Sequence, residues 1–184
     1  AMVEEGSLVG YGYWRHHSGG NWRRLNALIG TSPEGLMENL AEFQRRANEA
    51  DSGELEIGAG ACPRHDDYIW HVEASGGETG EGDVVLSQYL ICDESRSDET
   101  RAMIETQLAP VYNGFVEEGR LSSWTWLSHI IGGEFRNILS FAAPTDAEVL
   151  GAFGAGWEAT SDIDEMAAWP EICHSHDDYM WLTD

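Results

Sequence analysis

The strongest constraint on this fold is a nine-residue motif that occurs twice in the chain. Cys62–Trp70 (CPRHDDYIW) recurs as Cys173–Trp181 (CHSHDDYMW), with six of nine positions identical. A second match lies upstream of each copy, where residues 4–25 align without a gap to residues 117–138. The offsets of the two matches, 113 and 111 residues, agree closely. The sequence therefore predicts a tandem duplication in which both halves face the same packing problem.

The composition describes a globular and strongly acidic chain. Of 184 residues, 42% are hydrophobic and 8 are tryptophan, which is enough apolar material for a sizeable core. The formal net charge is −23, and all ten basic residues are arginine. A surface of this charge repels phosphate backbones and anionic lipids, so we expect neither nucleic acid nor membranes as partners. No apolar run reaches the length of a membrane span and no signal peptide is recognisable, so the sequence does not indicate a cellular location.

The cysteine content predicts free thiols. Cys62, Cys92 and Cys173 are too few for a disulfide framework, and two of them occupy matching places in the repeat. We therefore expect buried thiols, with Cys62 and Cys173 in equivalent environments.

Residue alternation and turn chemistry predict the elements of the first half. Side chains alternate in character over residues 7–17, which is the period of a strand. The glycine turn at residues 18–21 predicts a hairpin whose return strand is residues 22–29. The Ser-Pro pair at residues 32–33 indicates the start of a helix, and residues 68–72 have the composition of a strand.

The second half contains the same elements after an additional strand and helix. Thr145, with Glu148 three positions later, matches a capping box at the start of a helix. Pro110 should bend the helix that contains it or limit its first turn. The predicted elements are a strand at 84–92, a helix from 97, strands at 121–131 and 135–142, a helix from 145, a short helix at 161–168 that ends before Pro170, and a strand at 178–183.

This β-α-β-β-α-β order is that of the ferredoxin-like fold. A ferredoxin-like sheet carries helices on one face and leaves its other apolar face open, so a second copy has to cover that face. The sequence therefore predicts an α+β protein in which tandem ferredoxin-like repeats form an α/β-barrel-like core, within one chain or by formation of a homodimer. The expected domains are a partial repeat at 3–73, a Gly-rich linker at 74–83 and a complete repeat at 84–184.

At this point the chain resembles the dimeric α/β-barrel superfamily, which includes the antibiotic-biosynthesis monooxygenases and the stress-responsive barrel proteins. The resemblance covers residues 84–184 in full and 3–73 in part. It depends on the element order, on Trp124 and Trp126 in the second strand of the repeat, and on the duplication. No catalytic motif of the superfamily is recognisable, so the resemblance implies a fold and assigns no functional residue.

The first repeat departs from this pattern, because it has no counterpart of residues 84–116. Those residues supply the first strand and helix of the second repeat. That strand is central in a ferredoxin-like sheet, so we expect its absence to split the sheet. Either the chain continues beyond this sequence, or another segment or chain fills the gap.

The repeated motif supplies the candidate catalytic residues. Residues two apart on a strand share a face, so His65 should lie beside Asp67, and His176 beside Asp178. A carboxylate next to an imidazole can fix its tautomer and raise its basicity, which suits a general base.

Candidate ligand-binding residues come from the matching upstream segments and from aromatic stretches. Strand 4 of one half approaches strand 2 of the other in barrels of this type, so we expect His16 near His176 and His129 near His65. A strand arginine that faces inward could pair with a ligand carboxylate, and aromatic side chains could line a pocket for a planar molecule. The further candidates are Arg23, Arg136, Tyr11, Tyr13, Trp124 and Trp126.

Three functional interpretations follow from these residues. The first is a barrel that binds a small apolar or aromatic molecule between its sheets, including the case of a cofactor-independent enzyme. The second is a non-catalytic structural or interaction module, in which the aspartates cap turns and the aromatic residues anchor the last strand. The third is a metal site, because Cys62 and Cys173 each precede a histidine by three positions. No cofactor motif is recognisable, so we expect no cofactor.

Overall fold

The computed structural model describes residues 2–50 and 64–183. The chain divides into two compact units. The smaller unit comprises residues 1–13 and 25–67, and the larger comprises residues 14–24 and 68–184. Residues 14–24 therefore belong with the C-terminal part of the chain. The predicted domain boundaries stay a prediction.

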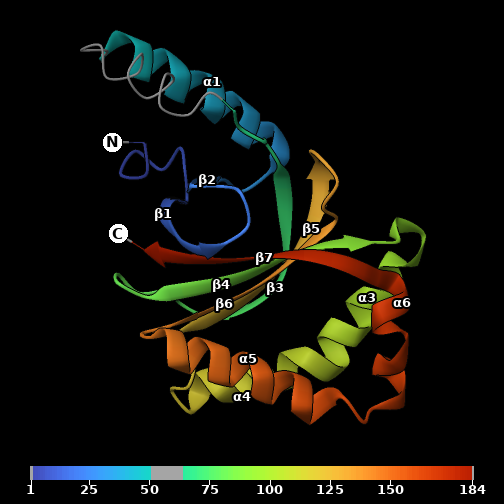
Figure 1. The fold of residues 1–184 in the computed structure, drawn as a ribbon. Coiled ribbons are helices and arrows are strands. Elements are labelled where there is room, and N and C mark those ends of the chain that lie inside the picture. The colour runs from blue at the N-terminus through green and yellow to red at the C-terminus, as the bar shows by residue number, and fades with distance from the viewer. Residues whose placement is uncertain (1, 51–63, 184) are drawn as a thin grey trace. The chain divides into compact units, whose positions relative to one another are not determined.

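The larger unit contains a complete ferredoxin-like arrangement (Figure 1). Strands β7, β4, β6 and β5 are neighbours in that order and all pair antiparallel, with α3, α4, α5 and α6 on one face. The elements are β4 (Val84–Cys92), α3 (Ser97–Met103), α4 (Ala109–Glu117), β5 (Ser123–Ile131), β6 (Asn137–Ala143), α5 (Asp146–Thr160), α6 (Trp169–Ile172) and β7 (Cys173–Thr183). Short 3₁₀ turns at Glu94–Arg96 and Asp164–Ala168 and a π-helical turn at Ile104–Leu108 complete this part. The α+β class and the ferredoxin-like fold predicted from the sequence are confirmed.

Two further pairings extend the sheet. Strand β1 (Gly10–Gly19) pairs with β7, and β3 (Ile69–Gly77) pairs with β5. With β2 (Arg24–Ile29), the full order is β2-β1-β7-β4-β6-β5-β3. The fourth strand of each half was expected to approach the second strand of the other half. Both pairs are found, as β7 with β1 and as β3 with β5. The expected split of the first half's sheet is found, because β1 and β3 pair with β7 and β5 and stand at separate places in this order.

The core beneath the sheet faces the helices. β4 is apolar along almost its whole length because it is the central strand, buried from both sides. Trp124 and Trp126 on β5 are each 1% exposed and pack with Tyr112 of α4 and Trp169 of α6, respectively. The Trp124 indole N–H donates to Asn113 Oδ1 at 2.8 Å, which satisfies its one polar atom.

Aromatic side chains fill the opposite face of the sheet in the larger unit. Trp22 stacks on Tyr179 with ring centroids 5.0 Å apart and meets Tyr89 edge-on at 4.9 Å. Phe135 and Tyr68 lie 5.8 and 6.2 Å from the same Trp22 ring. These five residues are called the aromatic cluster below. The cluster occupies the region in which the sequence predicted a ligand between the sheets.

The tyrosine of each motif copy packs against a Gly-Gly turn. Tyr179 Oη accepts a hydrogen bond from the backbone N–H of Asn21 at 3.1 Å, and a Cβ placed on Gly20 would lie 1.9 Å from the Tyr179 ring. In the same way, a Cβ on Gly133 would lie 2.4 Å from Tyr68 Oη. The motif and the turn therefore recur together because one is the packing partner of the other.

The prediction of free thiols is wrong for two of the three cysteines. Cys92 and Cys173 form a disulfide with an S–S distance of 2.13 Å. They end β4 and begin β7, and the strand register sets them opposite each other. The sequence pattern missed this because Cys92 has no counterpart in the repeat. Cys62 lies outside the described residues.

Several local boundaries differ from the predicted ones. Strand β3 continues through Gly77, within the residues predicted as a Gly-rich linker. β7 begins at Cys173 and not at residue 178. Pro170 lies in the first turn of α6, where its missing N–H costs nothing, so a helix begins there rather than ending before it. Of the two outcomes expected for Pro110, the structure has the second, because Pro110 lies in the first turn of α4, directly after the π-helical turn.

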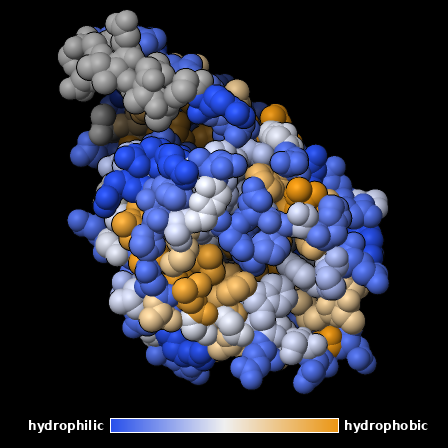
Figure 2. All heavy atoms as spheres, viewed as in Figure 1, coloured by the Kyte–Doolittle hydropathy of each residue, from blue (hydrophilic) through white to orange (hydrophobic). Residues whose placement is uncertain are grey.

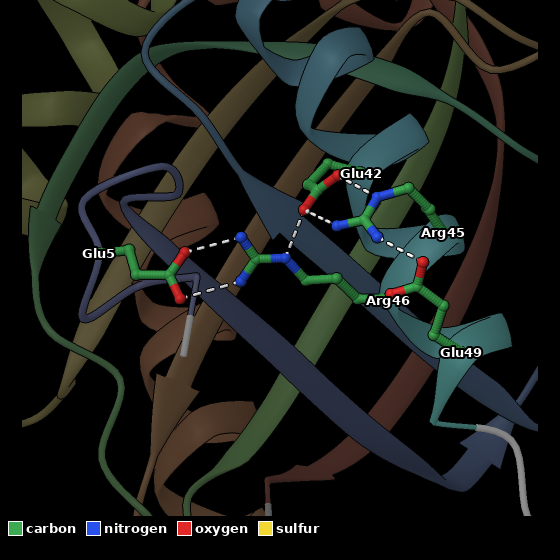
Figure 3. Close-up of polar contacts among 5 residues, drawn as sticks. All are labelled: Glu5, Glu42, Arg45, Arg46 and Glu49. Atoms are coloured by element: carbon green, nitrogen blue, oxygen red, sulfur yellow. Dashed lines mark hydrogen bonds and ion pairs between the residues drawn. The ribbon is translucent and has the colours of Figure 1, made fainter.

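The smaller unit contains α1 (Pro33–Glu49), which begins as predicted with Ser32 as its N-cap. Arg46 binds Glu5 through two nitrogens at 2.8 and 2.9 Å and also binds Glu42 (Figure 3). Arg45 binds Glu42 and Glu49 on the same helix. Hydrogen bonds from Arg45 and Arg46 lower the pKa of Glu42 to about 2.

The exposed face drawn in Figure 2 is mainly hydrophilic, with smaller apolar patches. Within the described residues, no helix has both the length and the apolar character needed to cross a membrane.

We predict that Gly19→Ala destabilises the protein more than Gly82→Ala. Both glycines have positive φ, +88° and +83°, so alanine is strained at either site. A Cβ on Gly19 would also lie 2.1 Å from the Asp178 carbonyl oxygen, whereas nothing lies within 4 Å of one on Gly82. The extra loss of unfolding free energy for Gly19→Ala should be about 1–3 kcal/mol, measured by chemical denaturation. Equal losses for the two variants would contradict the close approach of β1 and β7.

Candidate binding pocket beside His129

The structure forms both predicted His–Asp pairs. His176 Nδ1 lies 3.0 Å from Asp178 Oδ1, and His65 Nε2 lies 3.2 Å from Asp67 Oδ2. Gln88 donates from Nε2 to Asp178 Oδ1 at 3.1 Å and so orients this carboxylate. All four paired side chains are at least 47% exposed, and none of them lines the pocket described below. Their catalytic role stays a prediction.

His16 and His176 are not brought together. The register places His16 opposite Trp181, and the two rings meet edge-on with centroids 6.2 Å apart. Trp181 and His176 are five residues apart on β7, about 16 Å along the strand and on opposite faces. The expected proximity of His16 and His176 is therefore wrong. The other expected pair spans the two units, since His65 belongs to the smaller unit and His129 to the larger, and it stays a prediction.

The predicted aromatic lining between the sheets does not form, and of its four members Trp126 alone lines the pocket described below. Trp124 and Trp126 both face the helices, so they do not border a space on the other side of the sheet. Tyr11 and Tyr13 are in the smaller unit and are 74% and 40% exposed. The alternation of β5 decides the orientation of the tryptophans, which composition alone could not assign.

A small pocket of about 50 Å³ lies where β3, β5 and β6 meet the segment that follows β4. Three of its residues, Trp126, His129 and Arg136, were predicted as ligand-binding residues from the sequence. The complete lining is Glu73, Cys92, Glu94, Ser97, Thr100, Arg101, Trp126, Ser128, His129, Arg136 and Asn137.

Glu73 forms the carboxylate centre of this pocket. Ser128 Oγ donates to Glu73 Oε1 at 2.7 Å, and Arg101 contacts both carboxylate oxygens at 3.3 Å. Burial of the Glu73 side chain, which is 19% exposed, favours its neutral form. The hydrogen bonds from Ser128 and Arg101 outweigh this effect and lower the pKa of Glu73 below its ordinary 4.5.

His129 lies between the pocket and the aromatic side chains of β3. Its side chain is 14% exposed, and its ring meets Trp70 edge-on with centroids 5.8 Å apart. Nδ1 lies 3.8 Å from Glu94 Oε1, which also binds Arg136 Nε at 3.0 Å. Nε2 is buried and has no hydrogen-bond partner within the described part of the chain. A buried imidazole nitrogen without a partner is costly to maintain, and this points to a group that satisfies it.

The matching residues His16 and Arg23 show what makes His129 different. Arg23 Nη1 lies 3.1 Å from His16 Nε2 and donates to the Gly20 carbonyl at 3.2 Å. His16 Nε2 also lies 2.8 Å from the Gly19 carbonyl, so either contact satisfies this nitrogen, depending on the tautomer. At the second copy, Arg136 Nη1 makes the matching bond to the Gly133 carbonyl at 2.8 Å and Glu94 binds Nε, while His129 Nε2 has no partner within the described residues.

Glu94 comes from the part of the chain that the first half lacks. It follows β4 directly, within residues 84–116. The pocket is therefore asymmetric, because it combines repeated residues with an unrepeated segment. Sequence reasoning missed Glu73, Glu94, Arg101 and Ser128 because it searched for residues present in both copies. The signal that could have found Glu94 and Arg101 is their position in the unmatched segment.

The described residues do not support a metal centre. They contain no group of three or more His, Cys, Asp or Glu side chains placed to hold a metal ion. Cys173 is taken up by the disulfide, which removes one ligand of the predicted Cys-x-x-His pair. The other cysteine of this prediction, Cys62, lies outside the described residues.

Comparison with known proteins identifies related folds but no family. No protein-family model matches the chain, and no curated protein matches it in sequence. A proposed monooxygenase from Lactobacillus acidophilus NCFM has a similar structure, with a TM-score of 0.59, 6% identity, and coverage of 99% of this chain and 81% of that one. An anthrone oxidase-like protein has a TM-score of 0.52, 13% identity, and coverage of 100% and 81%.

A third similar structure is a major regulator of staphylococcal pathogenesis, with a TM-score of 0.51 and 13% identity, and coverage of 98% of this chain and 87% of that one. At these identities the likeness shows a shared fold alone. It agrees with the resemblance drawn from the element order of the sequence.

We predict that Glu73→Gln lowers stability at neutral pH and that this loss disappears in acid. The pKa of Glu73 is lowered in the folded state, so its ionised form favours folding above pH 4.5, and this contribution is lost as the pH falls through the lowered pKa. The difference from wild type at pH 7 should be about 1 kcal/mol, measured by urea denaturation across pH 3–7. Glu158→Gln, on the exposed side of α5, is the control and should show no such trend. A difference independent of pH would contradict the role given to the Glu73 charge.

Proposed function

We propose that this protein binds a small molecule through a polar head group placed in the pocket beside His129. The observation that carries this proposal is the buried His129 Nε2 atom without a partner, next to a pocket lined by charged groups. Enclosed pockets with a few convergent polar groups are the usual form of small-molecule sites.

The size of the pocket limits what enters it. A volume of about 50 Å³ admits roughly four water-sized positions, since one water needs about 10–15 Å³ of this volume. A hydroxyl, carbonyl or carboxyl group fits, whereas a ring does not. The body of the ligand must then lie outside the pocket, against the surface around its mouth.

Apolar surface is available near this mouth. Ile130, two residues beyond Ser128 on β5, is 38% exposed. This arrangement suits a ligand with an apolar or aromatic body and a polar end. The sequence placed the ligand in the middle of the barrel, which the aromatic cluster occupies. We propose the edge formed by β3 and β5 in its place.

The charges of the pocket restrict the chemistry further. Glu73 is paired with Arg101, and Glu94 with Arg136, so neither sign of charge is in excess in these two pairs. His129 is the group that could accept or deliver a proton at the ligand, which makes proton transfer the reaction that this site would support. A cofactor-independent enzyme is the form of activity consistent with that arrangement.

The similar structures support the class of this proposal. Two of them are described as a monooxygenase and as an anthrone oxidase-like protein, and both descriptions refer to chemistry on small molecules. Their identities of 6% and 13% allow no residue role to be transferred, so the proposal depends on the geometry of this chain.

A structural role is favoured for the other repeated residues. Tyr68 and Tyr179 pack against Gly133 and Gly20, contacts that explain their recurrence without any ligand. We therefore propose a structural role for the tyrosines of the motif. The chemical role is proposed for His129, which lies in the matching segment upstream of the motif.

We predict that His129→Ala abolishes or weakens ligand binding by at least about tenfold, which corresponds to the loss of a buried hydrogen bond worth about 1.4 kcal/mol. Binding is measured by protein-observed NMR titration with phenol, cyclohexanone and benzoate as probes. The expected result is a set of chemical-shift changes at Ser128, His129 and Arg136 for at least one probe.

His16→Ala is the matched control, because His16 occupies the equivalent place in the first half and lies outside the pocket. It should leave the dissociation constant unchanged within about twofold, since no ligand contact is removed. Equal weakening by both variants, or shift changes confined to other parts of the protein, would reject the proposed site.

A further inference from the structure

The Cys92–Cys173 disulfide belongs to the wall of the pocket. Cys92 is one of the lining residues, and it is the last residue of β4. The next residues, Asp93 and Glu94, form the turn that supplies the carboxylate bound to Arg136. The disulfide therefore anchors the segment that carries Glu94. The contact of Glu94 with Arg136 is what makes the His129 site differ from the equivalent place around His16.

Few other contacts attach this turn to the start of β7. The backbone N–H of Asp93 donates to the Ile172 carbonyl at 2.9 Å, and Arg96 lies 3.9 Å from Glu171 across a largely exposed gap. The Glu94 side chain is 63% exposed, so its pair with Arg136 is partly solvated and weak by itself. The covalent bond is the strongest of these attachments.

The pocket gives a small thiol a route to the disulfide. Cys92 and Cys173 are 8% and 6% exposed, so the pocket that Cys92 lines is the route by which a small thiol reaches the sulfur. A bound ligand would occupy the same route.

We propose that Cys92–Cys173 is an exchangeable disulfide whose oxidation state controls the wall of the His129 pocket. A dithiol reacts in two steps. Its thiolate attacks Cys92 Sγ, the bond to Cys173 Sγ breaks, and Cys173 leaves as a thiolate that takes up a proton. The second thiol then attacks the mixed disulfide, releases Cys92 as a thiol, and leaves the dithiol oxidised. Two electrons and two protons pass from the dithiol to the protein.

The consequence of reduction is local. Once the bond is broken, Glu94 is held by the Asp93 hydrogen bond and by its own ion pair, so the turn opens more often. The Arg136 guanidinium, whose Nη1 also donates to the Gly133 and Phe135 carbonyls, then loses its Glu94 partner, and we expect it to approach His129 Nε2 as Arg23 approaches His16 Nε2 in the first half. This regulatory consequence for ligand binding rests on the proposed function, whereas the change in the turn does not.

The experiment compares the oxidised protein, the protein treated with dithiothreitol, and the Cys92→Ser/Cys173→Ser double variant. Mass spectrometry of alkylated peptides reports the state of each cysteine, and hydrogen exchange reports the opening of residues 93–97. We expect reduction under native conditions and an increase of about tenfold or more in the exchange rates of this turn, with the central strands β4 and β6 still protected. The double variant should match the reduced protein.

Thr79→Ala is the matched control, because it removes a 2.7 Å hydrogen bond to Ser123 on the neighbouring strand β5 without touching the pocket. It should leave the exchange of residues 93–97 unchanged. Free thiols at Cys92 and Cys173 in protein prepared without reductant would overturn the proposal. Unchanged exchange after reduction, or reduction only with loss of protection throughout the protein, would also overturn it. These measurements need no ligand, so failure of the proposed function would leave their outcome intact.

Discussion

The structure depends on two pairings between strands that are distant in sequence, β1 with β7 and β3 with β5. Each pairing sets a motif tyrosine against a glycine turn so closely that a Cβ could not be accommodated without movement. The same pairings place His16 opposite Trp181, and Trp70 opposite His129. A shift of one residue in the pairing would turn every side chain of a strand to the other face of the sheet. This packing therefore determines which face each side chain of these strands occupies.

The aromatic cluster is a consequence of that register. Trp22 reaches Tyr89, Tyr179 and Phe135 because the turn that carries it is held against β7. Ring contacts at these separations contribute about 0.5–1.5 kcal/mol each beyond the area they bury. Filling this face with rings removes the need for a second sheet there, and it also removes the space for a ligand.

The pocket arises where the two copies of the repeated segment stop being equivalent. His16 and Arg23 contact each other, whereas at His129 and Arg136 the carboxylate of Glu94 intervenes. The two halves share the same strands, and the site is asymmetric because one half contains an additional segment that the other lacks. The disulfide at the end of β4 holds that added segment at the frame, which links the redox state of the chain to the geometry of the site.

The sequence determined the order of the elements, their caps and the ferredoxin-like class, because alternation, Ser32, Thr145 and the glycine turns are local signals. It also predicted the His–Asp pairs, since both members lie on one strand two residues apart. It could not predict that Trp124 and Trp126 face the helices, because either face of a strand accepts an apolar side chain. The Cys92–Cys173 bond, the contact of Glu94 with Arg136 and the solitary His129 Nε2 were decided by tertiary structure, since each joins residues from different strands whose register is fixed only when the whole sheet assembles.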